Sequence, residues 1–240
     1  MSDPDGILLV DKPRDWTSHD VCAFVRKRFK IKKVGHAGTL DPLATGLLVL
    51  LIGKATKQSM PLSSCDKEYF GVMELGVKTD SHDRHGKVIG TGAWEAVTLD
   101  QVRQKALRYT GEIIQVPPMV SALKHQGVRL YELARKGVDV PRQGRKITVY
   151  HLNIEKKEER FIQFSARVSK GTYLRTLVND LGEDLGCYAA LADLRRIQCG
   201  VFRLDDSVTV DQLKLFSTEE FLRKLFPATP SASYAHLHGS

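Results

Sequence analysis

One glycine-rich stretch of the sequence, residues 35–46, combines a carboxylate with the features of a ligand-binding loop. It reads GHAGTLDPLATG, so Asp41 follows an apolar residue and precedes a proline. The three glycines allow the backbone to come close to a ligand, and Pro42 has a fixed φ and no backbone donor. A carboxylate held in such a loop can act as a nucleophile or as a proton donor and acceptor. The same pattern equally fits an aspartate in a tight turn, and the residue types alone do not separate the two interpretations.

A second group of potentially ligating side chains lies in residues 79–87. His82 and His85 are separated by two residues, and Asp80 and Asp83 lie beside the first histidine. These residue types can bind a metal ion, but no third ligand is framed by a rigid element. We therefore expect a solvated polar loop and no metal site. The four cysteines include no C-x-x-C pair, so we expect free thiols rather than a zinc or redox site.

Apolar patterns on both sides of residues 35–46 predict the elements that hold this loop. Residues 6–10 form a short apolar run that is typical of a strand. Thr17 and Ser18 precede apolar residues spaced by three and four, which predicts a helix of about ten residues that ends near residue 28. Residues 35–38 are expected to open a loop, and the continuously apolar residues 46–53 predict a buried strand.

The rest of the chain interleaves strand and helix patterns without regular β-α-β units. Thr98 and Gln101 have the spacing of a capping box in front of a helical pattern. We expect strands at 69–75, 149–154 and 161–168, helices at 98–109, 127–137 and 172–185, a polar loop at 79–87 and an extended stretch from 116. This order predicts an α+β fold with a mixed, mainly antiparallel sheet.

The charge of the chain points weakly to a polyanion. Its 240 residues contain 36 Lys and Arg against 28 Asp and Glu, a formal net charge of +8. Residues 26–33 contain no acid, and residues 124–146 carry seven cations against two acids. Such stretches suit nucleic acid, because each neutralised phosphate releases counterions; a solvated lysine-rich surface is the alternative.

The apolar runs of the sequence argue against a membrane protein. The longest purely apolar run, residues 47–52, is much shorter than the ~20 residues that span a bilayer. The first residues are acidic and polar and carry no secretory signal. We therefore expect a cytoplasmic protein.

Residues 35–46 resemble the signature of the TruB family of pseudouridine synthases, which is Gly-His-x-Gly-x-Leu-Asp-Pro-x-Ala-x-Gly. Further stretches resemble other motifs of this family in the same order, and together they extend over roughly residues 6–210. These stretches are residues 6–13, 66–69, 117–131, 169–175 and 194–196.

The resemblance implies the catalytic fold of that family, an α+β fold with a central cleft and flanking helices, and conversion of uridine to pseudouridine in RNA without cofactor or metal. It implies that Asp41 is the essential aspartate; whether it attacks the ribose or assists elimination is not decided by sequence. Tyr69 matches the tyrosine that stacks on the flipped base. Arg175 matches the arginine that pairs with the catalytic carboxylate, and such a pair keeps the carboxylate ionised.

Further RNA contacts are implied in the same way. The target base must leave its stack before a pocket can hold it. Tyr173 and Leu194 match residues that line the uracil pocket, and His36 matches a histidine that occupies the space vacated in the RNA loop. A thumb-like segment, residues about 119–146, is implied to close over phosphates, and we expect Lys124 and Arg129 to contact RNA there.

For the domain organisation, we expect residues 1–226 to form the catalytic domain. Residues 227–240, which are rich in Pro, Ser and Ala, are expected to be a disordered tail. Many bacterial family members carry a C-terminal RNA-binding PUA domain, for which this sequence leaves no room. RNA affinity is then expected to depend on the basic patches of the catalytic domain and to fall steeply with salt.

These expectations combine into a monomeric tRNA pseudouridine synthase that acts on the T-loop uridine. Its expected partner is tRNA, with no membrane association and no obligatory protein partner. The catalytic subunit of a guide-RNA machine shares these motifs but normally needs an appended RNA-binding domain and protein partners. An RNA chaperone is another alternative, although Asp41, Tyr69 and Arg175 argue against a purely binding role. A generic basic binding module would require the motif matches to be accidental.

Overall fold

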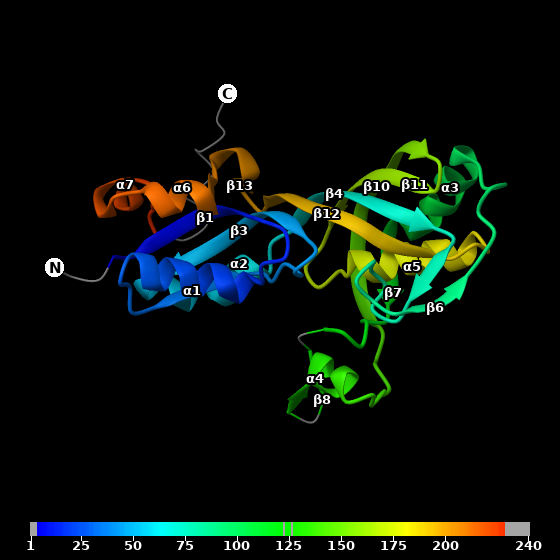
Figure 1. The fold of residues 1–240 in the computed structure, drawn as a ribbon, viewed down its shortest axis with the longest axis horizontal. Helices are drawn as coiled ribbons and strands as arrows, with labels where there is room; N and C mark the ends of the chain where they lie inside the picture. The colour runs from blue at the N-terminus through cyan, green and yellow to red at the C-terminus, as the bar shows by residue number, and fades with distance from the viewer. Residues whose placement is uncertain (1–3, 122, 126, 229–240) are drawn as a thin grey trace. The chain divides into compact units, whose positions relative to one another are not determined.

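The chain divides into two units that are connected through two strands. The computed structural model describes residues 4–121, 123–125 and 127–228 (Figure 1). Unit 1 comprises residues 1–69 and 194–240, and unit 2 comprises residues 70–193. The chain passes between them within β4 (Lys67–Leu75) and again within β12 (Ala189–Cys199).

Strands and short helices alternate in unit 1. In chain order they are β1 (Gly6–Lys12), α1 (Ser18–Arg28), β2 (Val34–Ala37), β3 (Thr45–Ile52), the 3-10 helix η1 (Gly53–Gln58), α2 (Ser59–Ser63), β13 (Phe202–Arg203), the 3-10 helix η3 (Leu204–Asp206), β14 (Val208–Thr209), α6 (Val210–Leu215) and α7 (Thr218–Arg223). β1 pairs antiparallel with β3 along its whole length, and β14 pairs parallel with β1. The other edge of β3 is shared by β2, which is antiparallel, and β12, which is parallel.

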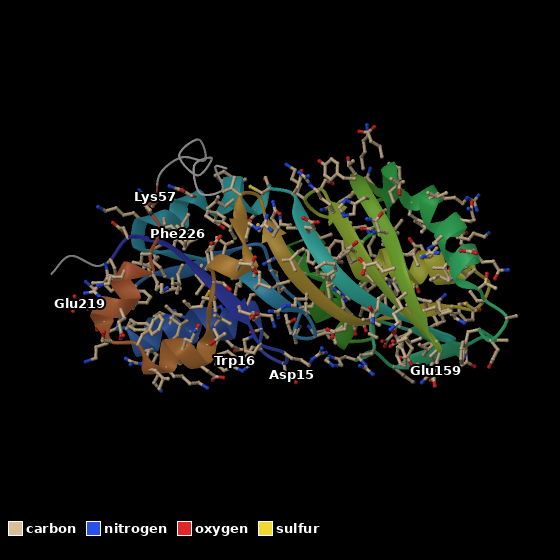
Figure 2. All side chains as sticks on the ribbon, turned by 90° about the horizontal axis from the view of Figure 1, so that it is seen from above. Asp15, Trp16, Lys57, Glu159, Glu219 and Phe226 are labelled. Carbon is tan, nitrogen blue, oxygen red and sulfur yellow. The ribbon has the colours of Figure 1, made fainter. Side chains whose placement is uncertain are left out.

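The core of unit 1 lies around β1 and β3. Both strands are buried along nearly their whole length, as expected for continuous apolar runs covered on two faces. α1 packs against β2, and α6 packs against β1. Near the end of the described chain, Phe226 exchanges two backbone hydrogen bonds of 2.9 and 2.8 Å with Ile7 (Figure 2). The buried central strands give the loops at their ends a rigid base.

The prediction that residues 35–38 open a loop was wrong, because residues 34–37 form β2. This strand pairs with β3 from Val34↔Ile52 to Ala37↔Val49. Its sequence, VGHA, is only four residues long and includes a glycine, so it carries no alternating pattern that identifies a strand. The neighbouring apolar strand supplies the hydrogen-bond partners that the local sequence does not reveal. The loop begins at Gly38, where φ is +87°.

Unit 2 contains a mainly antiparallel stretch of sheet, here called its main sheet, and two small two-stranded sheets. Its further elements are β5 (Val77–Thr79), β6 (Val88–Thr91), α3 (Leu99–Ala106), the 3-10 helix η2 (Leu107–Tyr109), β7 (Gly111–Gln115), β8 (Lys124–His125), β9 (Val128–Arg129), α4 (Leu130–Arg135), β10 (Arg145–Glu158), β11 (Phe161–Val168) and α5 (Leu174–Asp184). The main sheet has the order β4-β11-β10-β7. β5 pairs with β6, and β8 pairs with β9. α4 and β8 stand apart from the main sheet of unit 2 (Figure 1).

Most elements predicted in unit 2 are present, with changed limits. The helix expected at 98–109 is α3 followed by η2, and its Thr98–Gln101 capping box is formed. The helices expected at 127–137 and 172–185 are α4 and α5, and the strand expected at 149–154 is the longer β10. β7 and β12 were not predicted. The α+β class with mainly antiparallel pairing is confirmed.

The predictions for residues 79–87 and 227–240 have other outcomes. The loop expected to be solvated at 79–87 is partly buried, since Ser81 and Asp83 are only 9% and 7% exposed. The tail expected at 227–240 lies outside the described residues from 229 onward. Within the described part of the chain, every helix is too short or too polar to cross a bilayer.

Candidate active site

The loop that carries Asp41 is fixed on both sides of this residue. The Ser18 hydroxyl, at the start of α1, donates to the backbone carbonyl of Leu40 (3.1 Å) and accepts from its backbone N–H (2.8 Å). The Asp41 carbonyl accepts a hydrogen bond from the Ala44 N–H at 3.0 Å, which closes a turn. The half-buried Asp41 side chain therefore projects from a backbone that α1 and the turn hold in place.

A buried lysine supplies positive charge beside this loop. Lys12 is fully buried at the end of β1, and its ammonium donates to the carbonyls of Pro13 (2.8 Å), Trp16 (2.6 Å) and Pro42 (3.3 Å). Burial lowers the pKa of Lys12 to about 8, and the negative charge of Asp41 opposes this shift. The attraction is mutual, so Lys12 favours the ionised form of Asp41.

Arg196 connects the Asp41 loop to Tyr69. It is 1% exposed. Its Nε donates to the Leu47 carbonyl at 2.7 Å, and one terminal nitrogen donates to the Gly38 carbonyl at 3.2 Å. Its guanidinium also forms a hydrogen bond with the Tyr69 side chain. One buried side chain thus holds the start of the loop, a strand of the core and the predicted base-stacking tyrosine.

Tyr69 lies on β4 and is 8% exposed. Burial raises the pKa of its phenol, while the charge and hydrogen bond of Arg196 act in the opposite direction. Lys67, two residues earlier on the same strand, donates to the carbonyls of Ser63 (2.7 Å) and Cys65 (2.5 Å). Tyr69 is therefore a neutral phenol at neutral pH, able to donate a hydrogen bond and to present an aromatic ring.

His36 and Leu194 belong to the same unit. His36 lies on β2, and its Nδ1 has no hydrogen-bond partner among the described residues. Burial, followed by the charges of Arg196 and His19, lowers the pKa of His36, so its imidazole is neutral at neutral pH. Leu194 lies on β12 with only 7% of its surface exposed.

The predicted Arg175 lies in unit 2, at the start of α5, and is 4% exposed. One of its terminal nitrogens donates to the Ser81 carbonyl (3.0 Å) and lies 3.4 Å from a carboxylate oxygen of Asp83. The other donates to the Val120 carbonyl at 2.9 Å. The first turn of α5 is thereby connected to the loop after β5 and to the start of the thumb-like segment.

Asp83 is a structural partner of Arg175, which corrects the expectation of a solvated loop. Its carboxylate accepts hydrogen bonds from the Ser81 hydroxyl (2.8 Å) and the His85 backbone N–H (3.0 Å). His82 has a left-handed φ of +64°, and burial, followed by the charge of Arg175, lowers its pKa to about 4. Of the side chains that suggested a metal site, Asp83 instead pairs with the buried Arg175, while Asp80 and His85 are exposed. Among the described residues, no group of three or more His, Cys, Asp or Glu side chains could hold a metal ion.

Tyr173 is fixed by a reciprocal pair of hydrogen bonds within unit 2. The buried Gln115 side chain donates to the Tyr173 carbonyl (3.0 Å) and accepts from its backbone N–H (2.8 Å). This pairing sets the position at which α5 begins. The side chains of Lys124 and Arg129, expected to contact RNA, lie outside the part that the structure describes.

The predicted residues thus fall into two groups. His36, Asp41, Tyr69 and Leu194 belong to unit 1, whereas Tyr173 and Arg175 belong to unit 2. Sequence reasoning assigned no role to Lys12, Arg196 or Asp83. A signal was present for Lys12, because it is a charged residue at the end of a mainly apolar strand, whereas Arg196 lies in a strand with several polar residues and gave no such signal.

Comparison with known proteins gives consistent matches. Residues 26–174 match the family model described as TruB family pseudouridylate synthase (N terminal domain), and residues 175–228 match that of the tRNA pseudouridylate synthase B C-terminal domain. A protein of Opitutus terrae named tRNA pseudouridine synthase B is 46% identical over 228 residues, covering 95% of each chain. Its namesake from Geobacter sulfurreducens is 42% identical over 234 residues, which are 98% of this chain and 77% of that protein.

A solved structure is also similar. A chain in the crystal structure of a Cbf5-Nop10-Gar1 complex superposes with a TM-score of 0.71 at 29% identity over 93% of this chain. The present chain spans 60% of the length of that solved chain.

Proposed function

The chain belongs to the TruB family of pseudouridylate synthases, and we propose that it converts the T-loop uridine of tRNA to pseudouridine. The observation that carries this proposal is the fixed position of Asp41 beside the buried Lys12 and near the buried Tyr69. The names of the similar bacterial proteins support tRNA as the substrate.

In the proposed reaction the bond between ribose C1′ and uracil N1 breaks, and a bond from C1′ to C5 replaces it. The hydrogen of C5 is lost and N1 gains a hydrogen, so the product is an isomer of the substrate and no cofactor is consumed. Asp41 either attacks C1′ or removes a ribose proton to assist elimination. In both routes the carboxylate must be ionised, which the charge of Lys12 favours.

The other roles extend from this step. We propose that Tyr69, as a neutral phenol, stacks on the flipped uracil, and that Tyr173 and Leu194 line its pocket. His36 would occupy the space that the base vacates. Arg175 would pair with Asp41, as in the family that the sequence resembles. Each of these four roles is a prediction.

We further propose that residues 1–226 act as the catalytic domain, in which the segment at about 119–146 closes over RNA phosphates through Lys124 and Arg129. The protein is proposed to act as a cytoplasmic monomer without an obligatory protein partner. Light scattering of the purified protein at working concentration, with and without tRNA, tests the monomer. A dimer mass in both samples would overturn it.

The higher identity to the tRNA enzymes, 46% against 29% for the chain from the Cbf5-Nop10-Gar1 complex, favours a stand-alone enzyme over a subunit of a guided machine. A chaperone function that needs no chemistry would not explain the arrangement around Asp41.

The direct test uses purified protein, an unmodified tRNA transcript and no added metal or cofactor. Pseudouridine is mapped by carbodiimide adducts and reverse-transcription stops, with Asp41→Asn in parallel. We expect a T-loop stop that disappears in the variant while RNA binding changes by no more than a few fold. Residual turnover of Asp41→Asn above about one per cent of the wild-type value would contradict the proposed role of Asp41. Tight, salt-sensitive binding without any stop would move the assignment to a guided or chaperone function.

A further inference from the structure

The end of α1 carries a cluster of cations that the proposed chemistry does not use. We call residues 26–33 the basic turn; its cations are Arg26, Lys27, Arg28, Lys30, Lys32 and Lys33. It lies in unit 1, between α1 and β2. The simplest explanation of this cluster is a solvated, lysine-rich helix end. A binding role therefore needs support from the geometry of the turn.

The basic turn is ordered by backbone hydrogen bonds. The Ile31 N–H donates to the Arg26 carbonyl at 3.0 Å, and the Phe29 N–H donates to the Val25 carbonyl at 3.1 Å. Ile31 is 3% exposed, so its side chain anchors the turn in the core. This is the Schellman arrangement that ends many helices.

The left-handed position of this turn holds a lysine where glycine is usual. Lys30 has φ of +55°. Residues with a Cβ are disfavoured in this conformation, and glycine is the residue that helix ends normally select there. The fold therefore tolerates local strain to place an exposed ammonium at this point.

Four of the six cations of the turn form no ion pair within the part of the chain that the structure describes. Arg28 donates a hydrogen bond to the Phe216 carbonyl at 2.7 Å. None of the ion pairs among the described residues involves Arg26, Lys27, Lys30 or Lys33. Elsewhere in the unit such pairs do form, namely Lys54–Asp5, Lys214–Asp211 and Arg223–Glu219. The helix dipole favours Arg26 and Lys27 in the last turn of α1, but it does not account for Lys33, which lies beyond the end of this helix.

The position of the basic turn relative to Asp41 follows from α1. The first residue of this helix, Ser18, is hydrogen-bonded to Leu40 beside Asp41. The 11 residues of α1 rise by about 16 Å. The basic turn and the Asp41 loop are thus on one rigid unit, separated by approximately the length of this helix.

We propose that the basic turn binds the sugar–phosphate backbone of the substrate tRNA at a position remote from the flipped uridine. This inference rests on the proposed function for the identity of the RNA. The turn contributes affinity through phosphate charge and takes no part in the reaction at Asp41, so its loss raises KM and leaves kcat unchanged.

The main test neutralises three cations together, Lys27→Gln, Lys30→Gln and Lys33→Gln. Binding to full-length tRNA transcript is measured from 50 to 200 mM salt in the Asp41→Asn background, which prevents turnover. We expect the slope of log K against log salt to become shallower by about two units, and affinity at low salt to fall at least about tenfold. The matched control is Lys105→Gln, Lys156→Gln and Lys157→Gln in unit 2, which removes the same charge and should change neither quantity beyond a small general effect.

A single substitution separates RNA binding from folding. Lys30→Gly relieves the left-handed strain, so the melting temperature should rise or stay constant, while tRNA affinity falls about two- to fivefold and the salt slope decreases by about one unit. A merely structural lysine would give unchanged affinity.

The outcomes distinguish the two proposals. If the wild type forms pseudouridine in the T-loop and the triple variant keeps the wild-type slope and affinity, the basic turn is not an RNA contact. If the wild type binds tRNA through this turn but forms no pseudouridine, the proposed function fails and the contact stands. A triple variant whose kcat falls while KM stays constant would also overturn the inference, because it would place the turn in catalysis.

Discussion

Units 1 and 2 each contain a buried arginine, but the two arginines have different hydrogen-bond partners. Arg196 of unit 1 donates to two backbone carbonyls and shares a hydrogen bond with Tyr69. Arg175 of unit 2 donates to two carbonyls and contacts the carboxylate of Asp83. Unit 1 therefore uses its arginine to hold a loop and a ring, whereas unit 2 places the carboxylate of Asp83 against its arginine.

This difference indicates how each unit holds its predicted site residue. In unit 1 the Asp41 loop is positioned by fixed backbone, with buried cations around it. In unit 2 the orientation of Arg175 depends on the loop after β5, which supplies the Ser81 carbonyl and the Asp83 carboxylate, and on the Val120 carbonyl. Damage to Arg196 should therefore affect folding and chemistry together, while damage to Asp83 should act mainly through the orientation of Arg175.

The largest expected effect is that of Arg196→Met. It leaves the carbonyls of Gly38 and Leu47 and the hydroxyl of Tyr69 without their donor, and unsatisfied buried groups cost about 1–3 kcal/mol each. We expect a loss of at least about 3 kcal/mol in the free energy of unfolding and a severe loss of activity. Urea unfolding followed by the fluorescence of Trp16, in a Trp94→Phe background, measures the effect in unit 1.

Arg196→Lys is the control, because it keeps the charge but not the planar set of donors. It should retain the fold better than Arg196→Met, with activity still reduced. Equal stability of Arg196→Met and the wild type would remove the distinction between the two arginines.

The next effect is that of Asp83→Ala. Breaking a buried ion pair by removing one partner costs about 3–5 kcal/mol, and the carbonyl bonds to Arg175 should keep the loss near the lower limit. Unfolding followed by Trp94, in a Trp16→Phe background, should report it in unit 2. Asp83→Asn keeps an acceptor for Ser81 and His85 and should cost less. A loss of activity without loss of stability in Asp83→Asn would sharpen the role of Asp83 in orienting Arg175.

Titration distinguishes the units through His82 and Lys12. The pKa of His82 falls from 6.5 to about 4 on folding, so the unfolded chain binds more protons between these values. Stability is then lost as the pH falls from 6.5 to about 4, by at most about 1.4 kcal/mol per pH unit. In His82→Asn, whose asparagine tolerates the left-handed backbone, the free energy of unfolding should differ less between pH 4.5 and pH 6.5 than in the wild type. Urea unfolding at these two pH values measures the difference.

Lys12 also makes stability rise with pH, but over a higher pH range than His82. Its pKa falls from 10.5 to about 8 on folding, so stability from this group rises as the pH increases from about 8 to 10.5. Across this pH range the free energy of unfolding of the wild type should increase relative to that of Lys12→Met, whatever the difference between the two proteins at pH 7. Parallel stability curves of the two proteins from pH 8 to 10 would show that Lys12 is not desolvated.

The smallest expected effects come from two equivalent helix caps. Thr17 and Thr98 both form capping boxes, at α1 in unit 1 and α3 in unit 2. Thr17→Ala and Thr98→Ala should each cost about 1 kcal/mol. Only Thr17→Ala should also reduce turnover, about two- to threefold, because Ser18 beside it holds Leu40. Single-turnover rates measure the difference, and equal rates in both variants would uncouple α1 from the Asp41 loop.

Local patterns in the sequence were sufficient to predict many elements. Thr98 and Gln101 marked the start of α3, and the apolar run before Gly53 marked β3. The prediction failed where pairing with a distant strand decides the structure. β2 exists because β3 offers hydrogen-bond partners, and the pattern of β12 is interrupted by the charged Asp193, Arg195 and Arg196.

The candidate site shows the same division. The resemblance of residues 35–46 predicted the family, which the similarity to known family members confirms, and it singled out Asp41, whose role stays a prediction. Asp83 was interpreted as part of a solvated loop, because its partner Arg175 lies 92 positions away in the sequence.

The sequence by itself therefore determined the family, the choice of Asp41 as the candidate carboxylate, and the helices whose caps and apolar spacing are local. Only the tertiary structure decided which charges are buried and what compensates them. Arg196 reaches Leu47 across 149 positions, and Lys12 reaches Pro42 across 30. The cost of burying a charge depends on donors, acceptors and opposite charges brought together by folding, and such neighbours leave no periodic signal along the chain.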